Sequence, residues 1–79
     1  MFTYRMTSYK NGNLDYVIDS SRNFDTREDA VASAQYEAEY WHLCGHNDSE
    51  ILFTEDGAKR WAKDTEGNRY YKIYEVVSC

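Results

Sequence analysis

The chain of 79 residues lacks proline, has four glycines and two cysteines, and contains no long apolar run. Two cysteines are too few for a disulfide framework. No apolar run approaches the roughly 18 residues that a membrane span needs, and no signal-peptide core follows the N-terminus. The sequence therefore predicts a single domain over residues 1–79 that is cytoplasmic and does not associate with a membrane.

Acidic residues are concentrated in the middle of the chain. The whole sequence holds 14 Asp and Glu against nine Lys and Arg, for a formal charge of −5. Residues 25–56 alone carry −8, whereas residues 1–24 carry +1 and residues 57–79 carry +2. Such a distribution steers a protein toward a positively charged partner. The alternative interpretation is that the acidic residues only keep a small domain soluble, and this interpretation requires no partner.

The first third of the chain predicts a β-hairpin. Apolar and polar residues alternate from Phe2 to Thr7, which is the period of a half-buried strand. Asn11-Gly12, the favoured pair for a tight hairpin turn, follows, and a second alternating run covers residues 14–19.

A single helix is predicted from Arg27 to about Leu43, a stretch without glycine or proline. Thr26 stands three residues before Asp29, which is the arrangement of a helix cap. Small and apolar residues at helical spacing form one stripe that we expect to face a sheet, with a large tryptophan filling the core near the end of the helix. This stripe consists of Ala30, Val31, Ala34, Ala38 and Trp41.

The second half of the chain predicts further strands. Residues 51–53 suit a short buried strand, and residues 69–77 form a longer one rich in Tyr, Ile and Val. Residues 59–63 suit either a strand or a helical turn. The expected order is ββαβββ, and we predict an α+β fold: an antiparallel sheet of four to five strands with one helix packed on one face.

His42, Cys44 and His46 form the one cluster of metal-ligand residue types. Their spacing differs from the two separated ligand pairs of a zinc finger, and a histidine near a helix C-terminus is favoured by the helix dipole alone. The sequence also lacks a Ser-His-Asp constellation and a nucleotide-binding glycine loop. We therefore expect no metal, no cofactor and no enzymatic activity.

The acidic middle of the chain predicts a protein-binding face. Tyrosines four residues apart on the outer side of the helix favour recognition, because tyrosine is enriched at interfaces. Acidic residues of the helix and of the turn at residues 55–57 precede and follow these tyrosines in the sequence. The predicted partner contacts are Glu28, Asp29, Tyr36, Glu39, Tyr40, Glu55 and Asp56.

Single-stranded nucleic-acid binding by the C-terminal hairpin is the alternative. Bases and aromatic residues interleave there, and such a sheet face can stack nucleobases and hold phosphates. The candidate residues are Lys59, Arg60, Trp61, Tyr70, Lys72 and Tyr74. The low isoelectric point, about 4.8, disfavours this alternative because nucleic-acid-binding domains are usually basic.

The whole chain resembles the small early proteins of bacteriophages and mobile elements. It combines small size, acidity, a Tyr-rich hairpin, a helix opened by Asn-Phe-Asp-Thr-Arg-Glu-Asp-Ala and a closing β-meander. Among these proteins it is similar in build to anti-CRISPR proteins, and Glu55-Asp56-Gly57-Ala58-Lys59-Arg60-Trp61 locally resembles a stretch of one type I anti-CRISPR. The likeness lies in size, composition and element order, so it assigns no role to any single residue.

The resemblance implies a stoichiometric inhibitor that blocks a nucleic-acid-binding or catalytic surface of a host defence complex. Such complexes hold nucleic acid in channels lined by Arg and Lys. Carboxylates on a rigid domain can substitute there for phosphates. The expected partner is a host protein or nucleoprotein complex with a basic surface, and the oligomeric state stays open.

Overall fold

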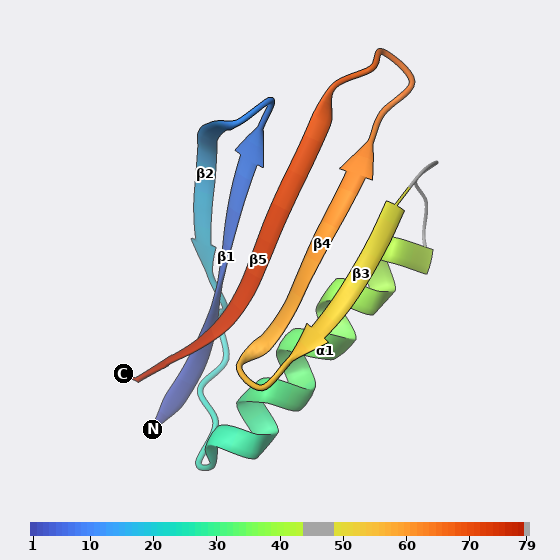
Figure 1. The fold of residues 1–79 in the computed structure, drawn as a ribbon. Coiled ribbons are helices and arrows are strands. Elements are labelled where there is room, and N and C mark those ends of the chain that lie inside the picture. Colours follow the sequence, from blue (N-terminus) through green and yellow to red (C-terminus); the bar gives the residue numbers. More distant parts are fainter. Residues whose placement is uncertain (44–48, 79) are drawn as a thin grey trace.

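The computed structural model describes residues 1–43 and 49–78, with the side chains of residues 42 and 43 left aside. Within this part of the chain the elements are β1 (Phe2–Lys10), β2 (Asn13–Asp19), α1 (Arg27–Leu43), β3 (Ser49–Thr54), β4 (Gly57–Lys63) and β5 (Arg69–Ser78), as Figure 1 shows. The predicted α+β fold is confirmed. The segment around Trp61, which the sequence left open, is a strand.

The strands form one antiparallel sheet in the order β2-β1-β5-β4-β3. The first and last strands therefore pair at its centre, from Phe2 opposite Ser78 to Lys10 opposite Tyr70. The β1–β2 hairpin turns through Asn11 and Gly12, whose φ angles of 51° and 86° are those of a tight hairpin turn. The Asn11 side chain also accepts a hydrogen bond of 2.9 Å from the backbone N–H of Arg69, which fixes the hairpin tip beside the start of β5.

The helix begins where the sequence predicts, since the backbone N–H of Asp29 donates to the Thr26 hydroxyl at 3.2 Å. Ala30, Ala34 and Ala38 are fully buried against the sheet. Their small side chains let α1 lie close over β1, β5, β4 and β3. The core below the helix consists of Ala34, Ala38, Ala58 and Tyr74, bordered by the half-buried side chains of Tyr4, Met6 and Ile51.

Two burial predictions are wrong. Trp41 does not plug the core, because it is 44% exposed at the end of the helix. The segment at residues 51–53 is not a buried strand: Leu52 and Phe53 are 54% and 49% exposed. β3 is an edge strand with a neighbour on one side only, which leaves these side chains partly uncovered.

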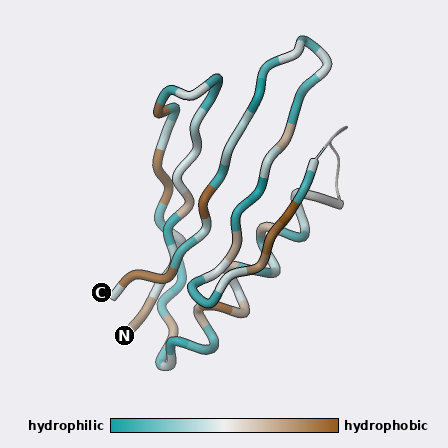
Figure 2. The backbone as a smooth tube through the Cα atoms, in the orientation of Figure 1, coloured by the Kyte–Doolittle hydropathy of each residue, from teal (hydrophilic) through white to brown (hydrophobic). Residues whose placement is uncertain are grey.

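Hydrophobic residues also lie on the opposite edge of the sheet. Every residue of β2 is exposed, including Leu14, Val17 and Ile18. Figure 2 shows hydrophobic colour on both edge strands, β2 and β3, and Figure 1 shows α1 running along the β3–β4 side, away from β2. The helix therefore leaves the β2 side of the sheet uncovered. No helix among the described residues is long and apolar enough to span a membrane.

Candidate functional sites

Tyr36 and Tyr40 project from the outer side of α1. They are 69% and 48% exposed, and their rings stack with centroids 6.4 Å apart and an interplanar angle of 25°. Trp41 meets the Tyr40 ring edge-on at 5.4 Å. Stacking of neighbouring rings limits their rotamers, so α1 presents a preformed aromatic ridge to solvent.

Exposed carboxylates lie on the same helix and on the β3–β4 turn beside it. Glu28, Asp29 and Glu39 are all exposed. Arg27 contacts the turn, because its guanidinium pairs with the Asp56 carboxylate and donates to the Glu55 carbonyl oxygen at 3.4 Å. The turn is thereby held against the first turn of α1.

The seven predicted partner contacts thus belong to the helix and to the turn that lies against its start. We call this set the acidic helix face: Glu28, Asp29, Tyr36, Glu39, Tyr40, Glu55 and Asp56. Among the described residues, the ion pair that this face makes is that of Asp56 with Arg27.

The predicted nucleic-acid-binding residues of the C-terminal hairpin do not share one surface. Tyr74 packs in the core beneath α1, and Arg60, Tyr70 and Lys72 lie on the same side of the sheet by strand alternation and cross-strand pairing. Lys59 and Trp61 occupy the opposite side. Tyr74 is only 2% and Arg60 only 4% exposed, so the six predicted residues do not form one exposed surface.

The side of the sheet away from α1 carries a different aromatic row. Trp61, Tyr71 and Tyr9 stand in register across β4, β5 and β1. The Trp61 and Tyr71 rings stack at 5.1 Å and 9°, and Tyr71 and Tyr9 at 6.1 Å and 28°. Lys59, Lys63 and Arg69 lie on the same side of the sheet by strand alternation, and Lys63, at the end of β4, also borders the helix-side cavity. We call these six residues the open sheet face.

Sequence reasoning missed Tyr9 and Tyr71 as members of a site. Tyr71 lies on the same side of the sheet as Trp61 because β5 pairs with β4 in a register that sets the two residues opposite each other. The sequence does not reveal that register. Tyr9 lies 62 positions away from Tyr71 in the chain, and the sequence contains no signal that β1 pairs with β5. This open sheet face exists only through that long-range register.

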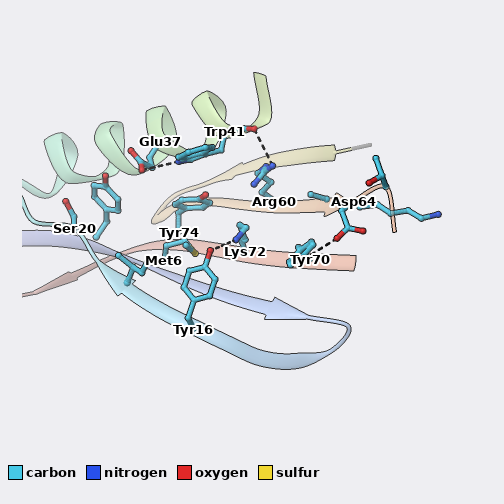
Figure 3. A pocket seen from close by; sticks show the side chains of 15 residues that line it. Met6, Tyr16, Ser20, Glu37, Trp41, Arg60, Asp64, Tyr70, Lys72 and Tyr74 are labelled. Atoms are coloured by element: carbon cyan, nitrogen blue, oxygen red, sulfur yellow. Dashed lines mark hydrogen bonds between the residues drawn. The ribbon is translucent and has the colours of Figure 1, made fainter. Parts of the chain in front are cut away.

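A cavity of about 610 Å³ lies on the helix side of the sheet, where α1 leaves the β2 side uncovered. Figure 3 shows side chains from α1, β1, β2, β4 and β5 converging on it. Aromatic rings supply much of its wall, and three cations, Arg60, Lys63 and Lys72, stand among them. The residues that define its chemistry are Tyr16, Trp41, Arg60, Tyr70, Lys72 and Tyr74.

Arg60 and Lys72 stand directly opposite each other on β4 and β5 in this cavity. The Arg60 guanidinium donates through Nη2 to the backbone carbonyl of Trp41 at 3.3 Å, while its buried Nε has no hydrogen-bond partner. Lys72 Nζ donates to the hydroxyls of Ser8 and Tyr16, both at 3.0 Å. No carboxylate in the described part of the chain forms an ion pair with either cation.

Two carboxylates also line the cavity, and both accept hydrogen bonds from the protein. Glu37 accepts from the indole N–H of Trp41 at 3.3 Å. Asp64 accepts from the backbone N–H groups of Glu66 and Asn68, both at 2.9 Å, and from the Asn68 side chain. Hydrogen bonds lower the pKa of Asp64, and the one from the Asn68 side chain has the largest effect. The carboxylate is therefore occupied by hydrogen bonds within the β4–β5 turn.

Tyr74 forms the floor between the cavity and the core. Burial raises the pKa of its hydroxyl to about 12, against the opposing influence of the neighbouring Arg60 guanidinium. The hydroxyl is therefore neutral at physiological pH and does not compensate the charge of Arg60.

The described residues contain no group of three His, Cys, Asp or Glu side chains close enough to hold a metal ion. The sequence cluster of His42, Cys44 and His46 lies outside the side chains that the structure describes. Comparison of the chain with known protein families, with curated proteins and with solved structures finds no match.

Proposed function

We propose that this protein is a small non-catalytic inhibitor that docks through its acidic helix face onto a basic surface of a host protein or nucleoprotein complex. The observation that carries the proposal is the stacked, exposed Tyr36–Tyr40 pair on a helix whose neighbouring carboxylates face solvent. Large aromatic side chains with few rotamers supply most of the energy at protein interfaces.

Charge supports the choice of partner. Glu28, Asp29 and Glu39 form no ion pair with any residue that the structure describes. They are thus available for charge-assisted bonds to the Arg and Lys side chains that line nucleic-acid channels. Long-range attraction would speed association, and the tyrosines would slow dissociation. The resemblance in build to anti-CRISPR proteins favours a CRISPR-type defence complex as the target.

The test is affinity capture from a lysate of bacteria with an active CRISPR-type defence system. Wild-type protein is compared with Tyr36→Ala/Tyr40→Ala and with Trp61→Ala, a control on the opposite side of the sheet. We expect wild type and Trp61→Ala to retain the same nucleoprotein complex, and the double variant to lose it. Equal retention by all three proteins, or retention of no nucleoprotein complex by wild type, would contradict the proposal.

Single-stranded nucleic-acid binding by the open sheet face is a second candidate, favoured by one specific observation. Trp61, Tyr71 and Tyr9 form a continuous stack beside Lys63 and Arg69, which are like charges in register on β4 and β5. Stacked aromatic rings with flanking cations suit single strands of any sequence. The site differs from the predicted one, because only Lys59 and Trp61 belong to both.

Fluorescence anisotropy with a labelled single-stranded oligonucleotide tests this second candidate. The expected result is binding that weakens as salt is raised and that Trp61→Ala reduces, while Tyr36→Ala leaves it unchanged. Absence of binding below about 100 mM salt would eliminate it.

A further inference from the structure

The Arg60–Lys72 pair in the cavity is unfavourable in the free protein. Like charges directly opposite each other on neighbouring strands destabilise a sheet. Neither cation has a carboxylate partner among the described residues, and Arg60 Nε is buried without a hydrogen bond. An unpartnered buried donor costs additional free energy. Local violations of this kind occur where a binding site requires them.

The geometry around Lys72 supplies both charge and a free donor. An ammonium group has three N–H donors, and two of them are used by Ser8 and Tyr16. Nζ lies 4.9 Å from the centroid of the Tyr16 ring and 5.7 Å from that of Tyr70. The cation is therefore placed between two aromatic walls, as Figure 3 shows, with one donor left over.

The cavity has the size and composition of a small-molecule site. Its volume of about 610 Å³ lies within the usual range for ligand pockets. Aromatic rings provide flat apolar surface, and the two lining carboxylates accept hydrogen bonds from Trp41 and from the β4–β5 turn. Three cations, Arg60, Lys63 and Lys72, outnumber the two carboxylates, so the cavity lining carries a net positive charge.

We propose that this cavity binds a small phosphate monoester that carries a flat aromatic group, of the size of a nucleoside monophosphate. A phosphate monoester carries a charge of about −1.5 to −2 at neutral pH, which matches the two opposed cations better than a single carboxylate does. Lys72 contacts the phosphate through its remaining N–H, and Arg60 contributes its charge from the cavity floor. The aromatic group lies against the rings of Tyr16, Tyr70 and Trp41.

The cations of this site are separate from the acidic helix face, because Arg60 and Lys72 lie on β4 and β5; the two surfaces adjoin where Trp41 meets the Tyr40 ring. Loss of phosphate binding would leave docking to a protein partner unchanged. The two proposals therefore succeed or fail separately.

The test titrates adenosine monophosphate into the protein and follows tryptophan fluorescence. The chain has two tryptophans, so a Trp61→Phe background leaves Trp41, at the cavity wall, as the single reporter. We expect a saturable change with the nucleotide, and at least tenfold weaker binding of adenosine and of inorganic phosphate used separately. No saturable change up to about 1 mM nucleotide, or equal binding of adenosine, would overturn the proposal.

Charge variants locate the site. Lys72→Gln is expected to weaken nucleotide binding at least tenfold, whereas Lys72→Arg, which keeps the charge, is expected to weaken it less. Lys59→Gln, on the same hairpin but on the other side of the sheet, serves as the matched control and should leave binding unchanged. Equal losses in Lys72→Gln and Lys59→Gln, or loss in Lys72→Arg as large as in Lys72→Gln, would contradict the assignment.

Discussion

Arg27 links the start of α1 to the β3–β4 turn, 29 positions away, by pairing with the carboxylate of Asp56. The same guanidinium donates to the carbonyl oxygen of Glu55. Acidic residues from two separate segments are thereby brought beside each other. This contact is the structural reason that the acidic helix face includes the turn.

Replacing Arg27 by Ala should change global stability little. Both partners are substantially exposed, and exposed ion pairs contribute about 0–1 kcal/mol. We expect the free energy of unfolding, measured with urea, to fall by less than about 1 kcal/mol. A loss of several kcal/mol would mean that the turn is more important to the fold than the contacts indicate.

Gly57→Ala should destabilise the protein strongly. A Cβ atom at Gly57 would lie 2.2 Å from the backbone oxygen of Tyr74, in the centre of the sheet, where the φ of +152° is already unusual. Because backbone atoms cannot move aside as the end of a side chain can, we expect the free energy of unfolding to fall by roughly 3 kcal/mol or more. Thermal and urea unfolding measure it.

Gly67→Ala is the matched control for that substitution. Gly67 also has a positive φ, +91°, but nothing lies within 4 Å of an added Cβ. Its cost should be limited to backbone strain, about 1–2 kcal/mol. Equal losses at the two positions would show that the clash with Tyr74 is not the cause.

Stability should decline at alkaline pH because of Tyr74. Its folded-state pKa is raised to about 12 from the ordinary 10, so the folded state holds the proton more tightly than the unfolded state. The stabilisation is fully present below pH 10 and is lost as pH rises through about 12, by about 3 kcal/mol in total. Urea midpoints between pH 9 and 12 measure the decline, which Tyr74→Phe should reduce.

Stability should also decline at acid pH because of Asp19. A hydrogen bond of 2.7 Å from Arg5 lowers the pKa of the Asp19 carboxyl below its ordinary value of 3.8. The stabilisation is present above that ordinary value and is lost as pH falls through the lower folded-state pKa. We expect Asp19→Asn to be less sensitive than wild type to acid below pH 4 in thermal unfolding. Identical acid sensitivity would contradict a role for the pair.

Local signals in the sequence predict individual elements well, because turn and cap chemistry acts within a few residues. Asn11-Gly12 turns the chain, and Thr26 caps the helix, as expected. The alternation of side chains along a strand also predicts that Arg60 and Trp61 lie on opposite sides of the sheet. It does not say which of the two faces the helix, since that depends on the packing of Ala34 and Ala38 against the assembled sheet.

Strand pairing between distant segments could not be predicted, and the sites depend on it. The register of β4 with β5 places Arg60 opposite Lys72, and the register of β1 with β5 places Tyr9 beside Tyr71. A hydrophobic run such as residues 51–53 suggests a buried strand. Leu52 and Phe53 are nevertheless exposed, because β3 lies at the edge of the sheet. The outward tyrosines of α1 were accessible to prediction, because helical periodicity is local.

The central claim is that the acidic helix face makes contact with a basic partner. The most direct measurement is the association rate of the captured partner with Asp29→Lys/Glu39→Lys, at low and at high salt. The control is Asp15→Lys/Glu66→Lys, which makes the same change in net charge at exposed positions outside that face. We predict that the helix variant associates at least tenfold more slowly at low salt, with a smaller difference at high salt, and that the control behaves like wild type. Equal slowing by both variants, or no slowing by either, would contradict the claim.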